Sequence, residues 1–243
     1  MIPWYRQAFD RRYFTVYPHR DEAAARDEAA FAIRALDLEP DDHVLDLACG
    51  AGRHARAFAA AGRRVVGFDL SHDLLAAAVR AGGGVDYVRG DMRRLPFRRV
   101  FDAVVGFFTS FGYFETEAED DTVLTAAAGA LRDKGRLLLD YVNRETVIAG
   151  LVPESDHEVN GHRVGQTRWI TPDGRRVEKR VRFYDGPDVA SEYTESVRLY
   201  SPEEIGAALE RAGFVLTARY GDLEGAGFAP DSPRLVCVAR RPC

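Results

Sequence analysis

Cysteine is scarce in this 243-residue sequence, and the three residues present, Cys49, Cys237 and Cys243, have the spacing of neither a disulfide framework nor a metal site. No apolar run reaches the ~18 residues that a membrane-spanning helix needs, and the first residues contain no apolar signal region. His, Asp and Glu form no cluster with metal-ligand spacing either. We therefore expect a cytoplasmic protein with no metal ion and no membrane partner.

Positive charge is also in deficit, since the formal net charge is −5 at pH 7. A protein that binds nucleic acid normally presents a basic face to the phosphates, so a nucleic-acid partner is not expected. The hydrophobic content of 46% is enough for a substantial core. A chain of this length can form one large α/β domain with an insertion, or one domain with a small lobe. The pattern indicates no oligomeric state and leaves a homodimer open.

The most informative stretch is Val44–His54, which has the pattern of an apolar strand, a glycine turn and the start of a helix over 53–61. Gly50 and Gly52 have no Cβ, so the backbone can turn sharply and approach a ligand closely. The first amides of the helix would point at that ligand, with the positive end of the helix dipole behind them. A second apolar strand ends in Asp69, where a carboxylate can accept both hydroxyls of a ribose. The pattern predicts a nucleotide-like ligand.

A plain strand-to-helix turn and a nicotinamide dinucleotide site are alternatives for this pattern. Asp46 lies inside the strand before the turn, where an acid would repel the pyrophosphate of a dinucleotide. S-adenosylmethionine has no phosphate and carries an ammonium, a sulfonium and a ribose, which an acid suits. The form Asp46-x-x-Cys49-Gly50-x-Gly52 resembles the first motif of the class I S-adenosylmethionine-dependent methyltransferases.

Two later segments extend this resemblance. Gly90-Asp91-Met92 resembles the adenine site of the family, where an acid meets the exocyclic amine and the next residue covers the ring. The stretch 101–108 resembles the fourth strand of the family's sheet. The resemblance implies S-adenosylmethionine as the cofactor. The cofactor-binding residues that it implies in this core are Asp46, Ala48, Cys49, Gly50, Gly52, His54, Asp69, Leu70, Asp91, Met92 and Phe107.

Two of these residues keep a second interpretation. His54 either touches the carboxylate end of the cofactor or only hydrogen-bonds locally. Cys49 is expected to pack as a small residue of the turn rather than to act as a catalytic thiol.

Strands and helices alternate from residue 44 to residue 141. The expected strands are 44–48, 65–69, 85–88, 103–107 and 136–141, and the expected helices are 53–61, 71–81 and 117–131. This alternation predicts an α/β fold with a doubly wound, parallel sheet and right-handed crossovers. In the family the last two strands, here 214–220 and 234–239, form a hairpin at the sheet edge. The expected fold is therefore a seven-stranded, mostly parallel, Rossmann-like sheet, and the motifs converge on one crevice at the carboxyl ends of its strands.

Helix boundaries are marked by local signals. Asp21, Ser71 and Ser201 are the expected N-caps of three helices. The residues expected on the inner face of the helix 71–81 are Leu74, Leu75 and Val79.

The parallel pattern stops near residue 150, and 151–200 are predicted to form an antiparallel β insertion. Asn160-Gly161, Pro172-Asp173-Gly174 and Asp185-Gly186 are turn signals between strand-like runs. We expect three to five strands, including 162–171, 175–184 and 193–200. In the family such an insertion often covers the substrate pocket, although a dimer interface or a structural cover are alternatives. Residues 41–150 and 201–243 would then form the cofactor-binding domain.

The N-terminal segment, residues 1–40, begins with a run rich in aromatic side chains and continues as a helix over 22–36. The aromatic residues either pack on the domain surface or form a lid over the cofactor and the substrate, as in related small-molecule methyltransferases. Tyr13 and Arg20 are the expected lid contacts with the cofactor, and Arg20 could pair with the methionine carboxylate.

Methyl transfer from a sulfonium is a direct displacement, so the enzyme mainly supplies alignment, desolvation and a deprotonated nucleophile. No obligatory catalytic motif is expected, and the leading candidates for catalytic residues are Tyr113 and Asp140. Tyr113 is either a base or an aromatic wall of the pocket, and Asp140 either holds an amine substrate or orients a loop. Weaker candidate bases are Tyr141, His157 and His162.

The segment after the fourth strand, 109–114, lacks the Asn/Asp-Pro-Pro-aromatic motif of many methyltransferases that act on ring amines or glutamine amides. Together with Gly90-Asp91-Met92-Arg93, the run Ser110-Phe111-Gly112-Tyr113 resembles the amino-sugar N-methyltransferases of antibiotic pathways. We therefore expect a methyltransferase acting on a nitrogen or oxygen of a small molecule. The alternatives are an RNA or protein acceptor, a nicotinamide-dependent oxidoreductase and a non-catalytic cofactor-binding protein.

Overall fold

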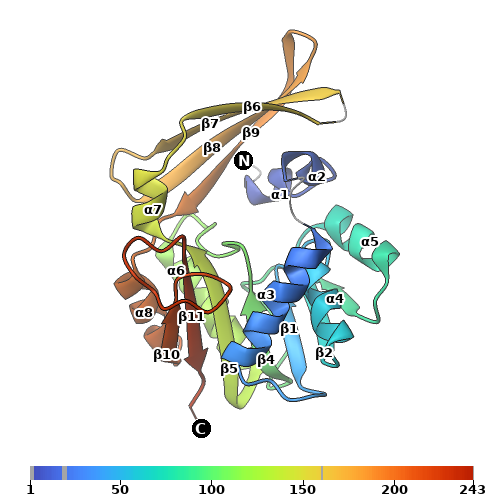
Figure 1. The fold of residues 1–243 in the computed structure, drawn as a ribbon, viewed down its shortest axis with the longest axis vertical. Coiled ribbons are helices and arrows are strands. Elements are labelled where there is room, and N and C mark those ends of the chain that lie inside the picture. The colour runs from blue at the N-terminus through green and yellow to red at the C-terminus, as the bar shows by residue number, and fades with distance from the viewer. Residues whose placement is uncertain (1–2, 18–20, 160, 243) are drawn as a thin grey trace.

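The computed structural model describes residues 3–17, 21–159 and 161–242. Its main layer is a seven-stranded sheet with the order β10-β11-β5-β4-β1-β2-β3 (Figure 1). These strands are β1 (His43–Leu47), β2 (Arg64–Asp69), β3 (Asp86–Arg89), β4 (Phe101–Gly106), β5 (Leu131–Val142), β10 (Val215–Tyr220) and β11 (Arg234–Arg240). Strands β1 to β5 pair in parallel, whereas β11 is antiparallel to both β5 and β10. The predicted mostly parallel sheet with an antiparallel edge is confirmed.

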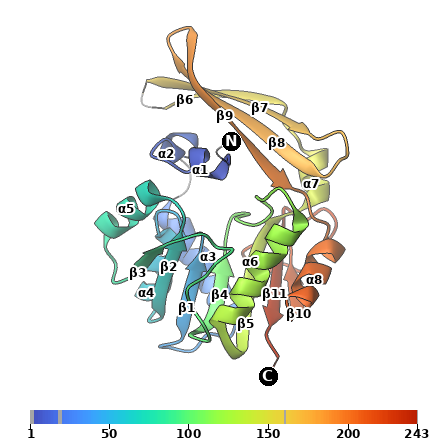
Figure 2. The ribbon, with the colours of Figure 1, turned by 180° about the vertical axis from the view of Figure 1, so that it is seen from behind.

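Helices cover both faces of this sheet (Figures 1 and 2). The helices are α3 (Glu22–Ala35), α4 (Arg53–Ala60), α5 (His72–Ala81), α6 (Glu117–Ala130) and α8 (Pro202–Arg211). Successive side chains of a strand point to opposite faces, so each buried strand contributes to two cores. In β4, for example, Val104 packs in the core beneath α6 and α8, and Val105 packs in the core beneath α3 and α4.

Each of the three expected N-caps is formed. The side chains of Asp21, Ser71 and Ser201 accept hydrogen bonds from backbone amides three residues later. The expectation for Val79 is wrong, because its side chain is 62% exposed and Ala78 takes the inward position in α5. Val79 is one helical step, about 100°, past Ala78, which carries it away from the sheet.

The insertion after the fifth strand forms a separate antiparallel sheet with the order β6-β7-β8-β9. Its strands are β6 (Glu154–Val159), β7 (His162–Ile170), β8 (Arg176–Asp185) and β9 (Asp188–Arg198), and α7 (Arg144–Ala149) precedes them. The last strand begins at Asp188 rather than at residue 193. The first strand, β6, was not among those expected by name. Its residues alternate between exposed and half-buried, and nearly all of them are polar, so the strand carries little hydrophobic signal.

The N-terminal helices α1 (Tyr5–Ala8) and α2 (Tyr13–Val16) lie between the two sheets (Figures 1 and 2). Ala8 and Val16 pack with Val181, Phe183 and Tyr193 of the insertion in a third small core. Over the part of the chain that the structure describes, no helix has the length and apolarity to cross a membrane.

Candidate active site

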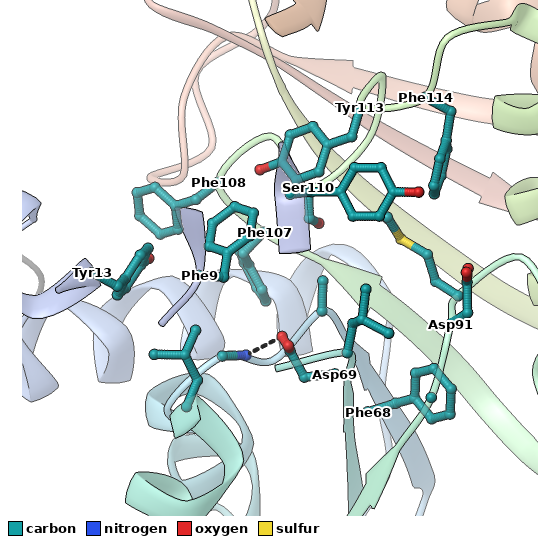
Figure 3. A pocket seen from close by; sticks show the side chains of 17 residues that line it. Phe9, Tyr13, Phe68, Asp69, Asp91, Phe107, Phe108, Ser110, Tyr113 and Phe114 are labelled. Carbon is teal, nitrogen blue, oxygen red and sulfur yellow. Dashed lines mark hydrogen bonds between the residues drawn. The ribbon is translucent and has the colours of Figure 1, made fainter. Parts of the chain in front are cut away.

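A cavity lies at the carboxyl ends of the parallel strands, beneath α1 and α2 (Figure 3). The residues expected at the site that line it are Tyr13, Ala48, Gly50, Asp69, Leu70, Asp91, Met92, Phe107 and Tyr113. Within the described ranges, no lining side chain is a lysine, an arginine or a histidine. The described lining residues therefore offer carboxylates and aromatic rings to a ligand.

The glycine turn between β1 and α4 brings the backbone to the cavity. Ala48, Gly50 and Gly52 all have positive φ angles, of 58°, 55° and 74°. Gly50 faces the cavity, whereas a Cβ on Gly52 would lie 2.2 Å from the hydroxyl of Tyr87. Gly50 thus permits close approach of a ligand, and Gly52 permits the packing of Tyr87 behind the turn.

Asp69 is fixed at the end of β2. One carboxylate oxygen accepts a hydrogen bond from Gly50 N at 2.8 Å, drawn as a dashed line in Figure 3, and the other accepts from Ser71 N at 2.7 Å. Burial raises the pKa of Asp69, and these backbone donors counteract that effect. The carboxylate keeps further lone pairs on the cavity side, as binding of two ribose hydroxyls requires.

Asp91 follows β3 and is oriented by Arg93. The guanidinium donates to Asp91 Oδ2 at 2.7 Å, and Arg93 N donates to Oδ1 at 3.0 Å. The hydrogen bond from the Arg93 side chain lowers the pKa of Asp91, so this carboxyl is ionised near neutral pH. Arg93 also lies over the ring of Phe114, at 4.3 Å from its centre, and thus contacts both Asp91 and Phe114.

Asp46 lies beneath the turn rather than in the cavity wall. Its side chain is 1% exposed, and Oδ2 has no hydrogen-bond partner in the described structure. Burial raises the pKa of Asp46 to about 7, and the nearby charge of Asp69 adds to this. A buried acceptor without a donor costs stability, so this oxygen is suited to a cationic partner supplied by a ligand.

These features test whether S-adenosylmethionine fits. Its ribose requires an acceptor such as Asp69, its adenine amine an acceptor such as Asp91, and its ammonium an acid such as Asp46. A dinucleotide would bring a pyrophosphate into a cavity whose described lining residues include no cation. The residues present fit S-adenosylmethionine and do not favour a nicotinamide dinucleotide.

The other wall of the cavity is aromatic. The Tyr113 ring contacts the rings of Trp4 and Phe9, with centres 4.8 and 5.8 Å apart. Trp4 Nε1 also donates a hydrogen bond to the carbonyl oxygen of Tyr113 at 3.3 Å. The lining residues that were not among the predicted cofactor-binding or catalytic residues are Tyr5, Phe9, Phe68, Leu74, Gly90, Phe108, Ser110 and Phe114, although Gly90 and Ser110 belong to motifs identified in the sequence. For Tyr5 and Phe9 the only available signal was the aromatic richness of the N-terminus.

Several expected residues lie outside the cavity lining. Cys49 is buried, and Gly52 packs against Tyr87. His54 Nε2 lies 2.7 Å from Glu28 Oε2, and its ring stacks on Phe107 at 4.1 Å between centres. Of the two interpretations of His54, local hydrogen bonding matches these contacts. Arg20 lies outside the residues that the structure describes.

Asp140, Tyr141 and His157 also lie away from the cavity lining, and the side chain of His162 is outside the part of the chain that the structure describes. Asp140 is fully buried, accepts from Phe108 N at 2.7 Å and pairs with Arg234. These contacts match its loop-orienting alternative. Tyr141 is buried and donates to the carbonyl oxygen of Arg198, and His157 contacts the carbonyl oxygen of Thr15 at 3.4 Å.

Comparisons with known proteins agree with this geometry. A family model described as a methyltransferase domain matches residues 44–135. A demethylmenaquinone methyltransferase of Thermobifida fusca is 35% identical over 183 residues, which cover 72% of this chain and 69% of that protein. A dTDP-3-amino-3,6-dideoxy-alpha-D-glucopyranose N,N-dimethyltransferase of Streptomyces fradiae is 29% identical over 195 residues, which cover 78% of this chain and 76% of that protein.

Solved structures show the same fold. CalS10 with bound S-adenosylmethionine, an amino pentose methyltransferase from Micromonospora echinaspora, is 28% identical with a TM-score of 0.68, and the match covers 94% of this chain and 96% of that one. The motif at the glycine turn, the carboxylates at successive strand ends and these similarities lead to one conclusion. The chain belongs to the S-adenosylmethionine-dependent methyltransferases.

Proposed function

We propose that this methyltransferase acts on the amino nitrogen of an amino sugar or a similar small amine. The observation that carries the proposal is the division of one cavity into two sides. Asp69 and Asp91 stand at the strand ends, and Ser110 and Tyr113 stand on the loop after β4. Relatives whose names specify amino-sugar N,N-dimethylation support the choice of a nitrogen acceptor.

Each side of the cavity has a task in this proposal. Bound S-adenosylmethionine supplies a methyl group activated by its sulfonium. Asp69 holds the ribose hydroxyls, Asp91 accepts from the adenine amine while Met92 covers the ring, and the charge of Asp46 attracts the ammonium from beneath the glycine turn. Ser110 and Tyr113 contact the acceptor and align its nitrogen. An amine in its neutral form is already a nucleophile, so the site needs no strongly basic side chain.

The division of the chain is part of the proposal. Residues 41–150 and 201–243 form the cofactor-binding domain, residues 151–200 cover the acceptor side, and residues 1–40 form the lid segment. Supporting contacts come from Phe9 and Tyr13, which line the cavity, and from Ser71, whose hydroxyl donates to the carbonyl oxygen of Phe9. A closed lid excludes water from the reacting groups. We also propose a cytoplasmic location, since Cys49 and Cys237 are free thiols.

Two measurements test the proposal. Calorimetry with S-adenosylmethionine and S-adenosylhomocysteine measures cofactor binding on the purified protein. A mass-spectrometric screen then offers dTDP-linked amino sugars, simple amines, phenols and quinols as acceptors. We expect the amino sugars to gain one or two methyl groups. Transfer to phenols or quinols alone would contradict the nitrogen acceptor, and cofactor binding without any transfer would contradict a small-molecule acceptor of these classes.

A further inference from the structure

The loop that leaves β4 enters the cavity wall through a strained turn. Phe108 and Thr109 have φ angles of 54° and 60°, so two consecutive residues with side chains adopt the left-handed conformation. Residues other than glycine rarely adopt it, because Cβ then crowds the backbone. Such a turn persists only when its surroundings hold it.

Asp140, at the end of β5, holds both backbone amides of the turn. Its carboxylate Oδ2 accepts from Phe108 N at 2.7 Å, and its carbonyl oxygen accepts from Thr109 N at 3.0 Å. The side chain is fully buried, so these hydrogen bonds form without competition from water. One residue of the central sheet therefore fixes two consecutive residues of the loop.

Arg234, at the start of the antiparallel strand β11, completes the arrangement. Its Nε donates to Asp140 Oδ1, and its Nη2 donates to Thr109 Oγ1 at 3.3 Å. Its guanidinium carbon also lies 5.3 Å from the centre of the Phe108 ring. Arg234 thus compensates the buried carboxylate and touches both residues of the turn. Arg53 lies over Phe108 as well, at 4.6 Å from the ring centre.

We propose that Asp140 and Arg234 are positioning residues that hold the strained Phe108–Thr109 turn and thereby set the cavity wall formed by Phe108 and Ser110. The inference rests on the proposed function, because that function places the acceptor against Ser110 and the cofactor in the same cavity that Phe108 lines. Asp140 has no role as a base, since its carboxylate oxygens bond to Arg234 and to the amide of Phe108 and it does not line the cavity. Without the pair the turn would relax toward an ordinary conformation and the Phe108 ring would leave its place.

Asp140→Asn tests this role. It keeps the volume of the side chain and removes the charge that Arg234 compensates. We expect the calorimetric Kd of S-adenosylhomocysteine to rise by about tenfold and kcat to fall, because the wall is no longer fixed. The matched control is Asp102→Asn. Asp102 also accepts from a backbone amide and pairs with an arginine, but at the other end of β4, and its variant should stay within about twofold of wild type.

The decisive variant adds Thr109→Gly to Asp140→Asn. Glycine adopts the left-handed conformation without hydrogen bonds from Asp140 and Arg234 to hold it. The double variant should therefore recover part of the lost affinity and kcat. A merely structural role for Asp140 predicts no recovery. A role as a base predicts an unchanged Kd, with loss of the acidic limb of the kcat pH profile and no recovery by glycine. Either result would overturn the proposal.

Thermal unfolding provides a readout that does not depend on the cofactor. The decrease in Tm caused by Asp140→Asn should be smaller in the Thr109→Gly background than in wild type, and equal decreases would overturn the proposal. If Asp140→Asn does not fold, Arg234→Lys replaces it in the same design. Lysine keeps the positive charge but lacks the guanidinium group that donates to both Asp140 and Thr109. If the wild type does not bind the cofactor, the proposed function is contradicted. The unfolding comparison would still test whether Asp140 and Arg234 hold the Phe108–Thr109 turn.

Discussion

The guanidinium of Arg12 lies 5.1 Å from the centre of the Phe183 ring, where the N-terminal segment meets the insertion. Arg12 also donates to Ser191 Oγ at 2.8 Å and is held by Asp10. On the other side, Phe9 and Tyr13 of the same segment line the cavity. The N-terminal segment therefore contacts the insertion through Arg12 and covers the cavity through Phe9 and Tyr13.

This link predicts that Arg12→Ala weakens cofactor retention. Loss of the cation–π contact and of the Ser191 hydrogen bond, together worth about 1–2 kcal/mol, should favour an open segment. We expect the dissociation rate of S-adenosylhomocysteine to rise by about 5–30-fold in stopped-flow measurements. The neighbouring Arg11 is the control, because its side chain is 88% exposed. An equal effect of Arg11→Ala would contradict the prediction.

Asp69→Ala should lower cofactor affinity by about 1–3 kcal/mol, because hydrogen bonds to a charged group are lost. Calorimetry on the folded variant measures this change. Asp86→Ala serves as a control, since Asp86 is exposed at the start of the neighbouring strand β3. Unchanged affinity of the Asp69 variant would rule out the ribose assignment.

Asp46 should make cofactor affinity depend on pH. The pKa of about 7 leaves much of this carboxyl protonated in the free protein at neutral pH. The cofactor's ammonium favours the ionised form, so affinity should rise by up to about tenfold per unit as the pH increases from about 5.5 to about 7. Calorimetry in buffers of different ionisation enthalpy should detect the released proton. In Asp46→Asn this proton release and most of the pH dependence should vanish, and their persistence would assign them to another group.

The same carboxyl should affect stability with the opposite sign. Between pH 3.8 and about 7 the native state retains a proton on Asp46 that the unfolded state releases. The contribution of Asp46 to the free energy of unfolding therefore falls as the pH rises through this window. Urea unfolding of the wild type and of Asp46→Asn at several pH values measures the difference. A difference that does not change with pH would contradict the raised pKa.

The contributions of the Tyr113 ring and of its hydroxyl to activity can be measured separately. The contacts with Trp4 and Phe9 involve the ring, so Tyr113→Ala should lower kcat/KM for the acceptor by about 10–100-fold. Tyr113→Phe keeps the ring and should cause a smaller loss. If both substitutions cause the same loss and the phenylalanine variant changes the pH profile, the hydroxyl takes part in proton transfer.

Gly52 and Gly62 form a matched pair for stability. Both have positive φ angles, but a Cβ on Gly62 meets nothing within 4 Å, whereas one on Gly52 would collide with Tyr87. Gly62→Ala should cost about 1–2 kcal/mol from the backbone alone. Gly52→Ala should cost about 1–3 kcal/mol more, because Tyr87 has to move. Equal decreases in Tm would show that Tyr87 adapts freely.

The core of the fold was predictable because its signals are local. Asp21, Ser71 and Ser201 cap helices through amides three residues away, so a few letters of sequence contain the whole interaction. It was also predictable that Asp69 and Asp91 line one cavity, although they lie on different strands. Parallel strands present their carboxyl ends at one edge, and the alternation of strands and helices sets that geometry.

The sequence by itself determined the fold, the family and a cavity bounded by acids at the strand ends. The tertiary structure decided which of these residues face a ligand and which face the protein. Asp140 pairs with Arg234 across the sheet, His54 pairs with Glu28 on another helix, and the aromatic residues near the N-terminus cover the cavity. These contacts depend on how distant elements pack against each other. Such packing produces no local sequence pattern around either partner from which the contact could be predicted.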